Sequence, residues 1–219
     1  MERRSCRTTG GVAEGLTRVP RGLQTGAEGP VFFCKPGDVY GVFSQWYPCR
    51  FTVNSAFIMD LCGFRTGPGG IYDVDVVFNC VEQCMMYCRA VLFDDDELRT
   101  FALEAEVDDV RKEVGRRTVT FSEVEWTGVR EQFVEMANYA KFSQNLEFRD
   151  FLLATGDREL VNATRDDAIC GIGMPAYTSK QQLRALKNRE NWGENRLGRA
   201  LERVRQRLRD EDMSDVGRE

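Results

Sequence analysis

The sequence predicts a single, predominantly helical domain with a few short strands near its N-terminal end. With 219 residues and 42% hydrophobic residues, the chain is long enough to bury one sizeable core. Short β-branched and aromatic runs come first, and amphipathic helical patterns fill most of the chain after residue 79. Residues 1–29 are rich in arginine and glycine and contain few large apolar residues. We therefore expect one ordered domain over 30–211, between disordered ends at 1–29 and 212–219.

Strands are expected at three places, where β-branched and aromatic residues gather between turn residues: 31–33, 51–53 and 73–78. Loops rich in turn residues separate them. Apolar residues at helical spacing predict the helices: 80–93, 95–105, 108–117, 123–142, 147–154, 181–190 and 194–209. Asn79 is the expected N-cap of the first.

The composition excludes several function classes. The chain has no histidine, which excludes Ser-His-Asp and Cys-His catalysis and histidine-ligated metals. Its eight cysteines form no C-x-x-C pair. Cys80, Cys84 and Cys88 share a helical face, where ordinary core packing is the commoner explanation and a metal site the alternative. A net charge of −5 argues against a dedicated DNA-binding module, and we expect a cytoplasmic or nuclear protein without membrane segments.

Lys141 lies at the edge of the apolar stripe on the helix predicted at 123–142. Residues at helical spacing define that stripe: Val129, Phe133, Met136, Ala137 and Ala140. A lysine at this boundary can extend its ammonium group to water. Alternatively, burial lowers its pKa and makes the amine a nucleophile.

The segment 78–93 is apolar nearly all round except for Glu82 and Arg89, which share one face. Charges on a buried helix need partners or a polar pocket. Glu82 could instead complete a capping box with Asn79, and Arg89 could form an internal ion pair. Further along the chain, the glycines at 171 and 173 and those before the last helix suggest either a phosphate site or ordinary turns and caps.

Taken in order, these segments resemble the NADAR (YbiA-like) family over residues 32–209. The resemblance lies in the following motifs: Tyr40-Gly41-x-Phe43-Ser44, the Glu82 helix, Gly115-Arg116-Arg117, Trp126, Ala140-Lys141-Phe142, Leu152 to Asp157, Asp167 to Gly173, and Asn195-x-Leu197-Gly198. It implies an α+β fold in which helices surround a small sheet.

The resemblance also implies an N-glycoside hydrolase that cleaves a bond between ribose C1 and an exocyclic amine, without a cofactor. The expected substrate is ADP-ribosylated guanine in DNA or RNA, with ADP-ribose as product. Ribosylamino intermediates of riboflavin synthesis are the alternative substrates. Cys170 and Gln83 stand where the family often has tryptophan and histidine. A non-catalytic ADP-ribose sensor is therefore a further alternative.

By the same resemblance, Lys141 and Glu82 are the expected catalytic residues. In one mechanism Glu82 acts as base or stabilises an oxocarbenium-like state. In the mechanism we favour from the sequence, Lys141 forms a Schiff base at C1 and Glu82 moves protons. The expected substrate-binding residues are Gly41, Phe43, Ser44, Trp46, Arg89, Arg116, Trp126, Asp167, Gly171, Gly173 and Asn195.

Overall fold

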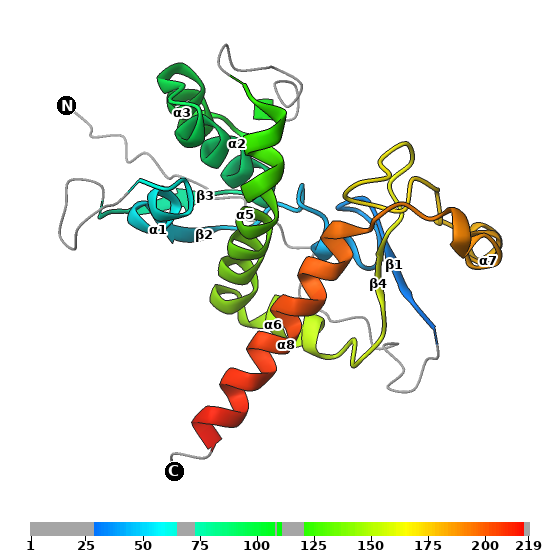
Figure 1. Ribbon diagram of the computed structural model, residues 1–219. Helices are drawn as coiled ribbons and strands as arrows, with labels where there is room; N and C mark the ends of the chain where they lie inside the picture. Colours follow the sequence, from blue (N-terminus) through cyan, green and yellow to red (C-terminus); the bar gives the residue numbers. More distant parts are fainter. Residues whose placement is uncertain (1–28, 65–72, 108, 111–120, 217–219) are drawn as a thin grey trace, which may run out of the picture.

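The computed structural model describes residues 29–64, 73–107, 109–110 and 121–216. As predicted, its α+β architecture is predominantly helical. The two longest helices, α5 (Glu123–Gln144) and α8 (Arg196–Val216), pack against each other at its centre (Figure 1).

The strands form two separate pairs in the described part of the chain, instead of the one small sheet expected. β2 (Phe51–Asn54) runs antiparallel to β3 (Asp75–Phe78), and β1 (Val31–Phe33) runs parallel to β4 (Leu160–Asn162). The two pairs lie on opposite sides of the α5–α8 crossing (Figure 1). The sequence predicted β1, β2 and β3 but not β4, whose three residues are too few to show a period.

Most helices follow the predicted pattern. The predicted ones are observed as α2 (Val81–Leu92), α3 (Asp96–Glu104), α5, α6 (Leu146–Leu153), α7 (Ser179–Lys187) and α8. The seven-residue α1 (Ser55–Leu61) was not predicted. Short 3-10 turns occupy Gly41–Phe43 and Arg189–Asn191. Most of the helix predicted at 108–117 lies outside the described residues.

The start of α2 differs from the predicted capping box. Cys80, not Asn79, is the N-cap, and its Sγ accepts a hydrogen bond from Gln83 N at 3.4 Å. Gln83 Oε1 in turn accepts from Asn79 N at 2.6 Å. Gln83 therefore has the reciprocal role expected of Glu82, so Glu82 is not needed as a cap.

Two apolar clusters meet along α5. Phe133 belongs to the cluster that β2, β3, α2 and α3 enclose. Phe142, about two and a half turns later, belongs to the cluster formed by β1, β4, α6 and α8. One continuous helix thus connects both cores.

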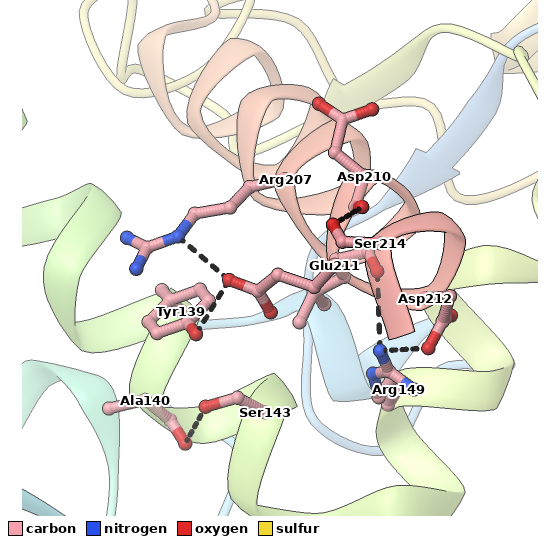
Figure 2. Close-up of polar contacts among 10 residues, drawn as sticks. Tyr139, Ala140, Ser143, Arg149, Arg207, Asp210, Glu211, Asp212 and Ser214 are labelled. Atoms are coloured by element: carbon pink, nitrogen blue, oxygen red, sulfur yellow. Dashed lines mark hydrogen bonds and ion pairs between the residues drawn. The ribbon is translucent and has the colours of Figure 1, made fainter. Parts of the chain in front are cut away.

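The last helix extends beyond its predicted end. α8 continues to Val216, so residues 212–216, expected to be disordered, are helical. Arg149 holds this end by donating to Leu208 O and to Asp212, and Tyr139 donates to Glu211 (Figure 2). The predicted disordered residues 1–28 and 217–219 lie outside the described residues.

Within the described ranges, every helix is too short or too polar to traverse a lipid bilayer. The described cysteines are free thiols. Among the described residues, no three cysteine, aspartate or glutamate side chains are placed to hold a metal ion. Cys80, Cys84 and Cys88 are therefore not placed as a metal site either.

Candidate active site

A pocket of about 660 Å³ opens at the carboxyl ends of the parallel strands β1 and β4, a common ligand position beside parallel strands. Its wall combines segments that are distant in the sequence: Cys34, Lys35 and Pro36 after β1; Ser44, Gln45 and Trp46; Glu82 on α2; Asn162, Thr164 and Arg165 around the end of β4; Asp167, Cys170 and Tyr177; and Leu197 on α8. Four predicted site residues meet here, namely Glu82, Ser44, Trp46 and Asp167.

Glu82 and Asp167 supply carboxyl groups to this pocket. Burial raises the pKa of Glu82 to about 7, Arg89 opposes the shift and Asp167 adds to it. Asp167 Oδ1 accepts hydrogen bonds from Ile169 N at 3.1 Å and Cys170 N at 2.9 Å, which fixes the loop that carries it. Glu82 can therefore hold a transferable proton near neutral pH, next to a second carboxyl group.

Three pocket residues with cationic or aromatic side chains were not predicted. The Nζ of Lys35 lies 5.4 Å from the ring centroid of Tyr177, and Arg165 is part of the same wall. Trp46, which was predicted, adds a second ring. Cationic groups and aromatic faces suit phosphates and a base, respectively. No local sequence pattern marked Lys35, which lies two residues after the predicted strand 31–33.

Lys141 is fully buried behind the pocket wall. Its Nζ donates to Val42 O at 2.5 Å and to Ser44 O at 3.1 Å. The alternative that the ammonium group extends to water is therefore wrong. Burial lowers the pKa of Lys141 to about 8, although Cys49 and Cys80 act in the opposite direction. Ser44 lines the pocket and Lys141 does not. The Lys141 amine therefore contacts the backbone of a wall residue from the side away from the pocket.

Four other predicted residues lie outside the pocket wall. Gly41 is required by a tight turn, because a Cβ there would lie 2.1 Å from Pro36 O. Phe43 is fully buried in the apolar cluster formed by β1, β4, α6 and α8. Trp126 stacks on Phe133, with ring centroids 6.0 Å apart. Arg89 does not line the pocket but acts on Glu82 through its charge.

Gly171, Gly173 and Asn195 support the pocket wall without lining it. Gly173 has a φ of 70°, which favours glycine. The Asn195 side chain bridges the backbone of β4: Nδ2 donates to Leu160 O at 2.8 Å, and Oδ1 accepts from Asn162 N at 2.9 Å.

The start of α8 is occupied by protein contacts. The backbone N–H groups of Arg196 and Leu197 donate to carbonyls of the loop at 169–170. This favours the capping interpretation of the glycine-rich segments over a phosphate site there. Arg116, predicted to contact phosphate, lies outside the described residues.

Two of the positions that depart from the family pattern, Cys170 and Gln83, have different surroundings. Cys170 lines the pocket, and burial raises its pKa to about 12, so it is a neutral thiol. Gln83 is fully buried and donates to Ala105 O at 3.0 Å, which makes it a structural residue.

Comparisons with known proteins agree with this architecture. A family model described as NADAR domain matches residues 32–209. N-glycosidase R617 of Acanthamoeba polyphaga mimivirus is 32% identical over 166 residues, which are 75% of this chain and 86% of that protein. N-glycosidase YbiA of Escherichia coli (strain K12) is 31% identical over 122 residues, which are 56% of this chain and 67% of that protein.

Two further similarities differ in extent. Riboflavin biosynthesis protein VVA0006 of Vibrio vulnificus is 26% identical over 183 residues, which are 84% of this chain but 40% of that protein. The NMR structure of the E. coli protein YbiA has a TM-score of 0.63 at 23% identity, over 90% of this chain and 94% of that one. The fold is therefore that of YbiA.

Proposed function

This chain belongs to the NADAR domain family, and on that basis we propose that it is an N-glycoside hydrolase that removes ADP-ribose from ADP-ribosylated guanine. The observation that carries the proposal is Glu82 in the pocket wall, with a pKa raised to about 7. A carboxyl group that keeps its proton near neutrality suits protonation of a leaving amine.

The remaining wall fits the rest of this substrate. Lys35 and Arg165 provide charge for a diphosphate, and Trp46 and Tyr177 provide rings for a base. Relatives named N-glycosidase support cleavage of the same kind of bond. The relative named for riboflavin biosynthesis supports ribosylamino intermediates as the second candidate substrates.

In the direct route, water attacks C1 of the ribose while the bond from C1 to the exocyclic nitrogen breaks. Glu82 gives its proton to the leaving nitrogen, and Asp167 takes the proton of the attacking water. The products are the free base amine and ADP-ribose. The two carboxyl groups of the pocket thus divide acid and base roles, as in glycosidases.

In the covalent route, the Lys141 amine adds to C1 of the ring-opened imine and the base amine leaves with a proton from Glu82. Water then hydrolyses the Schiff base and releases ADP-ribose. The pKa of about 8 leaves about a tenth of the amine neutral at pH 7, but Nζ must first leave the carbonyls of Val42 and Ser44.

Separate incubations with an ADP-ribosylated guanine oligonucleotide and with ribosylaminouracil intermediates test the proposal. We expect release of ADP-ribose from the first, lost in Glu82→Gln and kept in Glu125→Gln, which makes the same change at an exposed position. Hydrolysis of only the second substrates would identify the riboflavin-type activity. Binding of ADP-ribose without turnover of either would identify a sensor.

Borohydride added during turnover distinguishes the two routes. A trapped adduct that disappears in Lys141→Ala would establish the covalent route. Full turnover in a folded Lys141→Ala variant would exclude it.

A further inference from the structure

Asn162, the last residue of β4, presents a nearly buried amide to the pocket. The residue is 4% exposed and belongs to the pocket wall. Its Oδ1 accepts a hydrogen bond from Thr164 Oγ1 at 2.7 Å, but no described residue accepts one from Nδ2. This nitrogen is not among the buried side-chain atoms left without a partner, so it is open to the pocket, where a ligand oxygen would accept its hydrogen bond.

A short polar chain orients this amide. Cys34 Sγ lies 3.6 Å from Thr164 Oγ1, which lies 2.7 Å from Asn162 Oδ1. The Thr164 hydroxyl donates to the amide oxygen, and the Cys34 thiol donates to Tyr177 Oη at 3.9 Å. The amide nitrogen of Asn162 therefore points away from Thr164.

The backbone of Asn162 is held in place by its neighbours. Its N–H donates to Asn195 Oδ1 at 2.9 Å, and its carbonyl accepts from Ile172 N at 2.9 Å. Gly171 leaves room for the side chain, because a Cβ there would lie 2.6 Å from Asn162 O and 3.2 Å from Nδ2. The donor is thus preorganised before any ligand binds.

We propose that Asn162 is a specificity-determining residue whose Nδ2 donates a hydrogen bond to an oxygen of the ribose that carries the scissile bond. Through Thr164 it adjoins the part of the wall with Lys35 and Arg165, and it packs against the loop that carries Asp167. In ADP-ribose attached to a base, that ribose lies between the diphosphate and the cleaved bond. This inference rests on the proposed function.

Calorimetric titration with ADP-ribose tests the role of Asn162. Asn162→Asp keeps the acceptor for Thr164 and removes the donor, whereas Asn162→Ala removes both. We expect ADP-ribose to bind at least about tenfold more weakly to either variant, since each loses a hydrogen bond in a buried site. Asn191→Asp is the matched control, because it makes the same change at an exposed residue outside the wall, and its affinity should equal that of the wild type.

ADP lacks the terminal ribose and serves as the second probe. Its affinity should change by less than about threefold in the Asn162 variants. An equal loss for ADP and ADP-ribose would overturn the ribose assignment. Wild-type affinity for ADP-ribose in an Asn162→Ala variant that melts cooperatively would overturn the inference and leave the proposed function intact.

Thr164 is a positioning residue in this arrangement. Thr164→Val should raise KM by several-fold with little change in kcat, and Thr164→Ser should restore KM because it keeps the hydroxyl. Equal kinetics in the valine and serine variants would contradict the orienting role. A wild-type protein that neither binds ADP-ribose nor hydrolyses its guanine adduct would overturn both this inference and the proposed function.

Discussion

The chemistry of Glu82 follows from its place at the second residue of α2. Gln83 provides the capping contact that a glutamate there could have made, and burial beside Asp167 keeps the Glu82 proton. Because the pKa of Glu82 is raised to about 7, the group is protonated below that pH and ionised above it. The proton that the proposed mechanism transfers to the leaving nitrogen is therefore available below about pH 7 and is lost as the pH rises.

We predict that kcat/KM falls as the pH rises through about 7, by about tenfold per pH unit at the alkaline end. Initial rates between pH 5 and 9 with the guanine adduct measure this. Glu82→Gln should lower kcat by about 10²–10⁴-fold and remove this limb of the profile, without lowering the melting temperature. An unchanged alkaline limb in the variant would assign the ionisation to another group.

Lys141 has a structural contribution that can be measured apart from catalysis. Lys141→Met leaves the buried Val42 carbonyl without its lysine donor, so we predict a loss of about 1–3 kcal/mol in the free energy of unfolding. In a protein of this size that lowers the melting temperature by about 2–4 °C per kcal/mol. Lys180→Met, on the exposed side of α7, is the control and should melt like the wild type. Equal melting of the two variants would contradict this role.

At the level of elements, the contact between α8 and β4 is unusually close. A Cβ on Gly198 would lie 1.9 Å from Leu160 O, and the Asn195 side chain bridges the same strand. The first turn of α8 thus lies directly on the strand that ends at Asn162. Any displacement of this turn would also displace the pocket wall.

Two glycine substitutions should have opposite effects. Gly198→Ala forces α8 away from β4, and we predict a loss of more than about 2 kcal/mol with reduced activity. Gly128→Ala, at an exposed position of α5 with open space around it, should stabilise by about 0.5–1 kcal/mol. Urea unfolding of both variants measures the difference. If both substitutions stabilise the protein, the contact between Gly198 and Leu160 O can relax to accept a Cβ, and the prediction for Gly198 is wrong.

Elements with a local signal were predictable, and those that depend on distant partners were not. Leu197, Leu201, Val204 and Leu208 mark one face of α8 in the sequence, and all are buried. β4 exists because Leu160 to Asn162 pair with β1, and no local pattern reports that pairing. The N-cap of α2 was misplaced by one residue because cysteine is not a usual cap.

At the scale of the whole molecule, the same distinction applies to the pocket. Glu82 stood out because a charge on an otherwise apolar helix is unusual, whereas Asp167 was expected from the family resemblance. Lys35, Asn162 and Tyr177 carry no local signal, and only the tertiary fold brings them to one wall. Lys141 stood out for its position on α5, but its contact with the carbonyls of a distant turn could not be read from helical spacing.

The far end of α8 should affect stability without affecting catalysis. A chain that ends at Leu208 loses the contacts of Arg209 with Asp157 and of Asp212 with Arg149. Arg209 is about 18 Å along the helix from Leu197 in the pocket wall. We predict a lower melting temperature, by about 2–4 °C for each kcal/mol lost, with kcat/KM within about twofold of the full chain. A large loss of activity at unchanged stability would contradict this separation.

The parallel pairing of β1 with β4 has a consequence for the order of assembly. Val31 meets Leu160 only after nearly all of the intervening chain has been gathered, and closing so long a loop is slow compared with helix formation. During refolding from urea, helical circular dichroism should therefore return before the ability to release ADP-ribose. A partly folded chain with its helices formed would lack the wall that joins Cys34 to Asn162, so we predict that the proposed hydrolysis requires the finished fold.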